Sequence, residues 1–83
     1  MERFNIGDVI SDDYTNYVVL RSDLCENGYY DSILIVKETK LKEFIRTQNK
    51  DLTKRIYASE DIYYDYYVVE KSKYKIKTIY TLE

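Results

Sequence analysis

The feature that most constrains this fold is a run of four apolar residues, Ile-Leu-Ile-Val, at positions 33–36. Alternate side chains of a strand point to opposite faces, so a strand through this run must be buried on both faces. The run lies within residues 29–38, which are rich in β-branched and aromatic side chains and follow the turn dipeptide Asn27-Gly28. The sequence therefore predicts a doubly buried strand over residues 29–38.

Two further strands are predicted before this one, over residues 4–10 and 14–21. Gly7 lies inside the first of them and marks a bulge or a close approach of another backbone segment. The residues between the two strands, Ser11-Asp12-Asp13, favour a turn because their side chains hydrogen-bond to local backbone.

The C-terminal part of the chain predicts a hairpin. Residues 62–69 (IYYDYYVV) and 74–82 (YKIKTIYTL) are rich in tyrosine and β-branched residues, and residues 70–73 are expected to form the turn between them. In the last segment, apolar side chains at even positions alternate with Lys73, Lys75 and Lys77. This alternation is typical of a half-buried antiparallel strand with lysines on its outer face.

Residues 40–56 predict a helix instead. The residues that recur there at spacings of three and four, and so share one helical face, are Leu41, Phe44, Ile45, Gln48, Leu52 and Ile56. The predicted order is β-β-β-α-β-β, an α+β, mainly β fold in a single domain spanning residues 1–83. The five strands are expected to form either a small antiparallel sheet or an SH3-like, partly open barrel with one helix.

Composition narrows the classes of function. Histidine, the commonest general base and activator of nucleophiles, is absent. The single cysteine, Cys25, has acids close by on both sides, which disfavour a reactive thiolate. The carboxylate pairs Asp12-Asp13 and Glu60-Asp61 are expected to cap turns, since no calcium-loop pattern accompanies them. We therefore expect a non-enzymatic protein with no cofactor and no metal site.

The same composition bears on location and origin. One cysteine cannot form an intramolecular disulfide, which fits a reducing compartment. The first residues contain no apolar leader, and no stretch approaches the roughly 18 apolar residues of a membrane span. The expected location is cytoplasmic. Abundant Lys, Ile, Tyr, Asn, Asp and Glu, with a single alanine, indicate AT-rich coding DNA, as in a low-GC bacterium or its phages and mobile elements.

Charge is distributed unevenly along the chain, although the net charge is only −2. Residues 1–36 and 56–70 carry net charges of −5 and −4, whereas residues 37–55 and 71–83 carry +4 and +3. In one interpretation, neighbouring blocks of opposite sign complement each other within the fold. In the other, an acidic, tyrosine-bearing patch faces one way and a lysine face the other.

The densest group of tyrosines supplies the candidate site. Tyrosine accounts for 11 of the 83 residues, and the densest group combines tyrosines with acids: Glu60, Asp61, Tyr63, Tyr64, Asp65, Tyr66 and Tyr67. Tyrosines are common interface hot spots, and acids steer association toward basic surfaces. The leading hypothesis is a protein-binding module, such as a phage or mobile-element inhibitor that binds a host or cognate protein. The alternative is a set of exposed tyrosines with no partner.

A nucleic-acid-binding domain is the competing hypothesis. Its contacts would be the basic helix and the lysine-rich segment 71–77, whose lysines, with Tyr74 and Tyr80, resemble a stacking platform. However, the lysines and tyrosines of this segment alternate onto opposite faces. In addition, a pI of about 5.2 is low for a nucleic-acid-binding domain.

A set of short matches lies in the first half of the chain, at Gly7-Asp8-Val9, Val18-Val19-Leu20, Ser22-Asp23 and Ile35-Val36 with Thr39. With these residues the chain resembles the opening of SH3-like barrels, including the toxin ribonucleases of the MazF/PemK type. That family has an Arg-Pro pair before its second strand, where this chain has Asn16-Tyr17, so the arginine on which its activity rests is missing. The resemblance implies a five-stranded barrel; a degenerate ribonuclease of this type would depend on Arg21 or Thr39.

Overall fold

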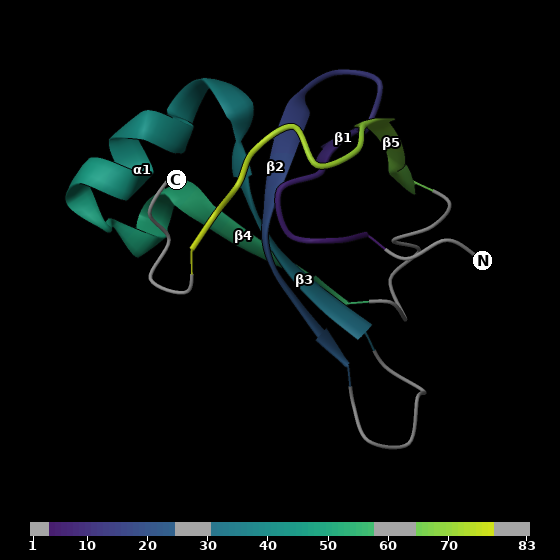
Figure 1. The fold of residues 1–83 in the computed structure, drawn as a ribbon, viewed down its shortest axis with the longest axis horizontal. Coiled ribbons are helices and arrows are strands. Elements are labelled where there is room, and N and C mark those ends of the chain that lie inside the picture. The colour runs from purple at the N-terminus through teal and green to yellow at the C-terminus, as the bar shows by residue number, and fades with distance from the viewer. Residues whose placement is uncertain (1–3, 25–30, 58–64, 78–83) are drawn as a thin grey trace.

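The computed structural model describes residues 4–24, 31–57 and 65–77 (Figure 1). The strands in these residues are β1 (Val9–Ser11), β2 (Asn16–Leu24), β3 (Asp31–Lys37), β4 (Thr53–Tyr57) and β5 (Tyr67–Glu70). Helix α1 (Leu41–Thr47) lies between β3 and β4, with short 3-10 turns at Glu38–Lys40 and Lys50–Leu52. The predicted fold class, α+β and mainly β, is confirmed.

The strands form one antiparallel sheet in the order β4-β3-β2-β1-β5. Strands β1 to β4 pair with their neighbours in the chain, as expected for short connections. Strand β5 then returns to the far side of β1, where Tyr67 lies opposite Ser11. The predicted five-stranded antiparallel sheet is therefore confirmed.

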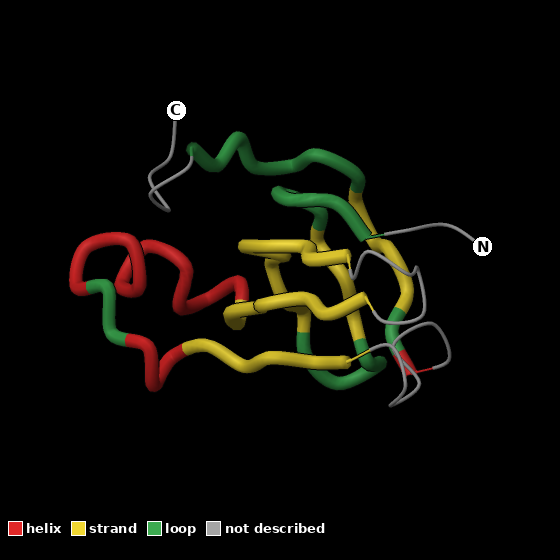
Figure 2. The backbone as a smooth tube through the Cα atoms, turned by 90° about the horizontal axis from the view of Figure 1, so that it is seen from below, coloured by secondary structure: helices red, strands yellow, loops and turns green. Residues whose placement is uncertain are grey.

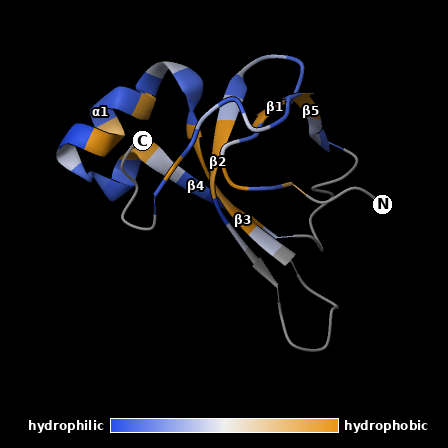
Figure 3. Cartoon of the chain, in the orientation of Figure 1, coloured by the Kyte–Doolittle hydropathy of each residue, from blue (hydrophilic) through white to orange (hydrophobic). Residues whose placement is uncertain are grey.

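Both faces of the sheet are buried. The inner core is built from all five strands and the N-terminal segment, with Phe4, Ile10, Val19, Ile33, Ile35 and Ile56 buried and Tyr17, Tyr66 and Val68 packed against them. The helix-side core lies beneath α1, with Val9, Val18, Leu20, Val36, Leu41 and Phe44 buried and Leu34, Ile45, Leu52, Tyr74 and Ile76 packed against them. Alternate residues of the run at 33–36 enter different cores, so the prediction of a doubly buried strand is confirmed. Figure 3 shows the hydrophilic outer side of α1 and the hydrophobic strands beneath it.

The sheet is curled rather than flat (Figure 2). The rings of Tyr17 in β2 and Tyr66 just before β5 meet edge to face, with centroids 6.1 Å apart, although β1 lies between those two strands. In a flat sheet, positions two strands apart are about 10 Å from each other. The curl therefore resembles that of a partly open barrel, and within the described residues β4 and β5 remain its two unjoined edges.

The prediction of a helix over residues 40–56 is wrong in its second half. Helix α1 ends at Thr47, because the next residue, Gln48, has a left-handed backbone (φ 55°). The Asn49 side chain then accepts a hydrogen bond from the Asp51 backbone N–H at 3.0 Å. Strand β4 follows at once and pairs with β3. Leu52 and Ile56 match the helical spacing but enter the helix-side and the inner core respectively. Within the described residues, no helix has the length and apolar character needed to cross a membrane.

The predicted hairpin of residues 62–69 with residues 74–82 is also wrong over the described residues. Strand β5 begins at Tyr67 and pairs with β1, while residues 74–77 contain only an isolated bridge, at Ile76. The predicted turn does form at residues 71–72. The predicted alternation also holds over residues 73–77, because Tyr74 and Ile76 pack against the helix-side core while the lysines between and beside them are exposed. Residues 62–64 and 78–82 lie outside the described residues.

The first strand is shorter than predicted because of Gly7. Its φ of 92° is incompatible with an extended strand, so β1 begins only at Val9 rather than at residue 4. The Gly7 carbonyl accepts a hydrogen bond of 3.1 Å from the Tyr74 backbone N–H, and the Gly7 N–H donates one of 2.8 Å to the Val19 carbonyl. The close backbone approach predicted at this glycine is therefore confirmed.

The segment after β5 is attached to the 3-10 turn that precedes α1. Glu38 Oε2 accepts hydrogen bonds from Lys73 Nζ at 2.8 Å and from the Tyr74 hydroxyl at 2.7 Å. The Lys73 ammonium, followed by the Tyr74 hydroxyl, holds the pKa of Glu38 below its ordinary value. These hydrogen bonds hold the segment after β5 in place, where Tyr74 packs against the helix-side core.

We expect acid to weaken this attachment. Because the pKa of Glu38 is lower in the folded state, the unfolded chain takes up the proton first as the pH falls below 4.5, the ordinary value. The stability contributed by the ionised Glu38 side chain is then lost as the pH falls through the pKa of Glu38 in the folded state. The free energy of unfolding of Glu38→Gln should consequently fall less on acidification than that of the unchanged protein, by about 1 kcal/mol. Urea unfolding at a series of pH values measures this, and parallel pH profiles would contradict it.

Candidate functional site

The turn between β1 and β2 exposes the side chain of Tyr14 next to Asp12 and Asp13. Asp12 Oδ1 accepts hydrogen bonds from the backbone N–H groups of Thr15 at 2.8 Å and Tyr14 at 3.0 Å. Ser11 Oγ accepts another, of 3.0 Å, from the Asp13 N–H, and Asp13 has a left-handed backbone with φ of 76°. The predicted turn is therefore confirmed, and its side-chain acceptors are the Ser11 hydroxyl and the Asp12 carboxylate. As a result Tyr14 is 93% exposed, on a turn held by three side-chain-to-backbone hydrogen bonds.

The electrostatics of this turn favour a charged carboxylate at Asp12. The Thr15 and then the Tyr14 backbone N–H groups hold the pKa of Asp12 below its ordinary value, and Lys54 makes a smaller contribution in the same direction. Asp12 thus stays ionised into mildly acidic solution and adds its negative charge to that of its neighbour Asp13.

The start of β5 completes the site from the other side. Tyr67 lies opposite Ser11 in the β1–β5 ladder, which places residues 65–67 beside the turn. Tyr66 turns inward against the Tyr17 ring, whereas Asp65 and Tyr67 are exposed, Tyr67 by 50%. Burial raises the pKa of the Tyr66 hydroxyl, and the nearby Asp12 and Asp65 charges raise it further.

Together these two segments line a hollow of about 370 Å³. We call the hollow and the adjacent tyrosine the acidic tyrosine surface, formed by Asp12, Asp13, Tyr14, Asp65, Tyr66 and Tyr67. Carboxylates in this surface offer hydrogen-bond acceptors, and the tyrosine rings offer apolar area with a hydroxyl at the end. Such a surface suits a basic partner that also presents apolar groups.

The predicted site residues divide into two groups. Glu60, Asp61, Tyr63 and Tyr64 lie outside the described residues. Of the others, Tyr66 faces inward while Asp65 and Tyr67 are exposed, and the sequence alone did not decide which of these side chains would be buried. The predicted strand conformation does not extend to Asp65, which is helical, and aspartate has a low preference for strands. Binding through these residues stays a prediction.

The contribution of the β1–β2 turn to this surface was not predicted. The sequence indicated a turn at Asp12-Asp13 but placed Tyr14 inside the following strand, which in fact begins at Asn16. The link between this turn and residues 65–67 depends on the pairing of β5 with β1. Local pattern does not specify that pairing, because the two segments are more than fifty residues apart in the chain.

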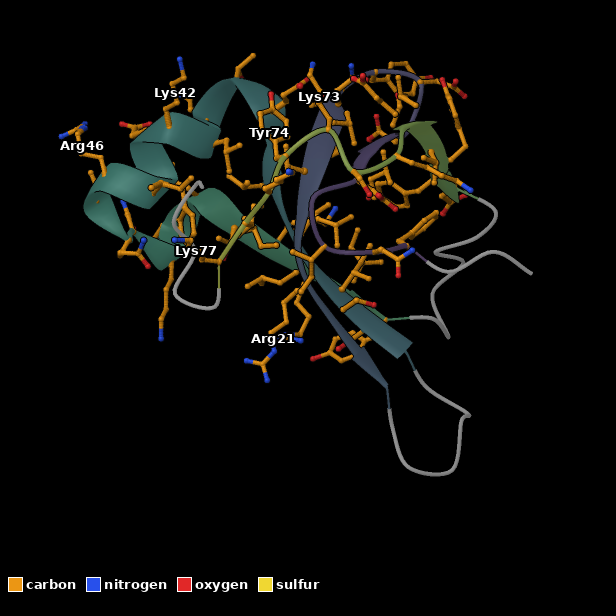
Figure 4. The ribbon with its side chains drawn as sticks, viewed as in Figure 1. Arg21, Lys42, Arg46, Lys73, Tyr74 and Lys77 are labelled. Atoms are coloured by element: carbon orange, nitrogen blue, oxygen red, sulfur yellow. The ribbon has the colours of Figure 1, made fainter. Side chains whose placement is uncertain are left out.

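The lysine-rich segment forms a different surface. Lys73 is engaged by Glu38 at 2.8 Å and lies 3.8 Å from a Glu70 carboxylate oxygen, with its ammonium 5.6 Å from the Tyr74 ring centroid. The neighbouring lysines of the segment, Lys71, Lys75 and Lys77, are exposed. Figure 4 shows Lys42 and Arg46 projecting from the outer side of α1, away from Tyr74. Lys73 thus lies over the Tyr74 ring, whereas Lys42 and Arg46 do not share a face with it.

No family model, curated protein or solved structure matches this chain. The likeness of the first half to toxin ribonucleases therefore rests only on the short segments that suggested it. The acidic tyrosine surface and the lysine-rich segment are the features of the described residues that bear on function.

Proposed function

We propose that this protein is a non-enzymatic protein-binding module whose contact is the acidic tyrosine surface. The observation that carries the proposal is Tyr14, which is almost fully exposed on a turn held by hydrogen bonds to Asp12 and Ser11. The backbone beneath the ring is already ordered and a tyrosine side chain has only two rotatable χ angles, so little conformational freedom is lost when a partner covers the ring. Tyrosine is also among the residues that contribute most to binding at interfaces.

The charges around Tyr14 indicate the kind of partner. Three carboxylates, from Asp12, Asp13 and Asp65, line the same hollow. They favour a basic protein surface, since complementary charge speeds association and disfavours acidic competitors. A host protein that binds nucleic acid has such a surface, and the carboxylates would then occupy the place of backbone phosphates. A cytoplasmic inhibitor encoded by a phage or mobile element fits this description and needs no catalytic groups.

The test is affinity capture from a lysate of a low-GC bacterium at moderate salt, with and without nuclease. We expect the unchanged protein to retain a specific protein after nuclease treatment, and Tyr14→Ser with Tyr67→Ser to lose it. The loss in affinity for the purified partner should be at least about tenfold, because a tyrosine hot spot contributes more than about 1 kcal/mol. Tyr57→Ser is the control, since Tyr57 lies on β4 and its exposure (46%) is close to that of Tyr67 (50%).

The double variant and the control must first show the circular dichroism and melting temperature of the unchanged protein. Equal retention by the double variant and the control would contradict the proposal. So would a partner whose affinity is unchanged by Asp13→Asn and Asp65→Asn, because the carboxylates would then play no part.

The competing candidate is nucleic-acid binding through Lys75, Lys77 and the outer side of α1, all of which are exposed. In that case the retained material is nucleic acid and disappears with nuclease. Its affinity would also fall steeply with salt, since neutralising each phosphate releases counterions. Lys75→Gln with Lys77→Gln should then weaken retention, while the two tyrosine substitutions should not.

A further inference from the structure

Strand β5 is one of the two edge strands of the sheet. In the order β4-β3-β2-β1-β5, one side of β5 pairs with β1, and among the described residues nothing pairs with its other side (Figure 1). The backbone N–H and C=O groups along such a side can form a ladder with another strand. The free side of β5 is therefore a place where a second chain can continue the sheet.

The two edge strands differ in how well they are protected against such pairing. Strand β4 carries Lys54 and Arg55, both exposed, and charged side chains on an edge strand disfavour pairing with another chain. Strand β5 has the sequence Tyr-Val-Val-Glu, without lysine, arginine or proline. Its charged residue, Glu70, is the last of the strand, and its carboxylate lies 3.8 Å from the Lys73 ammonium. Protection by charge is thus present on β4 and largely lacking on β5.

Strand β5 also exposes apolar side chains. Val68 packs against the inner core, so Tyr67 and Val69 point to the opposite face of the sheet. Tyr67 is 50% exposed and Val69 is 51% exposed. Within the described residues five large apolar side chains are exposed, and two of them belong to this four-residue strand. They lie where the side chains of an added strand would cover them.

These residues are complementary to a second copy of themselves. In an antiparallel pair of two β5 strands with Val68 opposite Val68, Tyr67 of each copy lies opposite Val69 of the other copy. Directly opposite residues share a face, so the four exposed apolar side chains meet there. An aromatic side chain opposite a β-branched one is a favourable cross-strand pair, and two-fold symmetry forms this pair twice.

The charge along the chain favours the antiparallel orientation. Strand β5 ends the block of residues 56–70, whose net charge is −4, whereas residues 71–77 after it contain four lysines and no acid. An antiparallel pair brings the chain that precedes one β5, including the exposed Asp65, toward the basic segment that follows the other β5. A parallel pair would bring like charges together, which is unfavourable. The uneven charge of the chain therefore suits self-association in one orientation.

We propose that this protein forms a two-fold symmetric dimer by antiparallel pairing of β5 with β5 of a second copy, so that the two sheets become continuous. Paired strands of four residues bury less area than a stable interface requires, so the dimer forms at high concentration and exchanges with the monomer. The dimer does not depend on the protein-binding function proposed above. Tyr67 belongs to both surfaces, whereas Val69 lies outside the acidic tyrosine surface. Variants of Val69 therefore test the dimer without changing a residue of that surface.

The test is sedimentation equilibrium of the full chain at concentrations between about 10 µM and 1 mM, a range that suits a small interface. We expect the average mass to rise with concentration from 10.0 kDa toward twice that value. Val69→Lys should raise the dissociation constant of the dimer at least about tenfold, because each dimer loses two apolar pairs and gains two lysines at the junction. Tyr57→Lys is the control, because Tyr57 has a similar exposure (46%) on the other edge strand, and it should leave the dissociation constant unchanged.

A measurement on the unchanged protein is independent of how the variants fold. In isotope-filtered NMR on a mixture of labelled and unlabelled chains, the Tyr67 ring of one chain should show contacts to the Val69 methyl groups of another. A monomer throughout the concentration range would overturn the proposal. So would a dimer that Val69→Lys leaves intact, that Tyr57→Lys weakens equally, or that shows no contact between Tyr67 and Val69 of different chains, because association would then use another surface.

Discussion

Gly7→Ala should lower the free energy of unfolding by about 3 kcal/mol. A Cβ atom at this position would lie 3.1 Å from the Tyr74 carbonyl carbon and closer still to the carbonyl oxygen, which is backbone and cannot rotate away. The φ of 92° adds a strain of about 1–2 kcal/mol for any residue with a Cβ. Overpacking of this kind costs about 1–3 kcal/mol more. A chain of this length has a total stability of only roughly 4–12 kcal/mol.

Urea unfolding followed by circular dichroism measures the effect. Ser72→Gly is the control, because Ser72 lies in the same junction and also has a positive φ, of 52°. This substitution adds no atom to the junction, unlike Gly7→Ala. The strain relieved and the flexibility gained in the unfolded chain roughly cancel, so we expect a change within about 0.5 kcal/mol. A Gly7→Ala protein as stable as this control would show that the two backbones do not approach as described.

Asp8→Ala should be destabilising to a similar extent, by about 3 kcal/mol. The Asp8 side chain is 1% exposed, and its two oxygens accept hydrogen bonds from different parts of the chain. Oδ2 accepts from the Asn5 N–H at 2.9 Å, and Oδ1 accepts from the Ser72 N–H at 2.8 Å. Hydrogen bonds to a charged group contribute about 1.5–3 kcal/mol each, and alanine leaves both N–H groups without this acceptor.

Asp8→Asn separates the two hydrogen bonds. Its amide keeps one acceptor oxygen but presents an NH₂ group to the other N–H, so we expect a loss about half as large as that of alanine. Asp12→Ala serves as the comparison on the surface, where water can replace the lost acceptor, so its cost should be smaller than that of either Asp8 variant. The expected order in urea unfolding is Asp8→Ala, Asp8→Asn, Asp12→Ala, and any other order would contradict the role assigned to the buried carboxylate.

Gly7 and Asp8 matter to the candidate site because they hold together the far ends of the paired strands β1 and β5, whose near ends carry it. They connect the residues before β1 to the segment that follows β5, through Tyr74 and Ser72. Strand β5 lies between this junction and residues 65–67 of the acidic tyrosine surface. A binding loss in either variant would therefore reflect a loosened β5, and variants at this junction are unsuitable as tests of the binding proposal.

Several elements could be recognised from local pattern because their cause is local. The apolar run at 33–36 required burial on both faces, and it has that burial. Gly7 indicated a close backbone approach, and Asp12-Asp13 indicated a turn held by side-chain oxygens. The alternation around Tyr74 and Ile76 indicated which side chains pack inward, although no regular strand forms over residues 74–77.

Other features depended on partners that are distant in the chain. The spacing of Leu52 and Ile56 is compatible with either a helix or a strand. Residues 53–57 form a strand because they pair with the open side of β3. Strand β5 has the same tyrosine-rich pattern whether it pairs with residues 74–82 or with β1. The position of Arg21 follows from one extra residue in β2, which reverses the face that simple alternation predicts.

Residue type and spacing thus determined the fold class, the doubly buried strand, the N-terminal turn and the absence of histidine chemistry. Each follows from the preferences of neighbouring residues for backbone conformation and burial. Tertiary structure alone decided the helix boundary, the sheet order and the candidate site. The acidic tyrosine surface is assembled from two segments brought together by strand pairing. Such pairing is selected by the energy of the whole sheet, so no single segment encodes it.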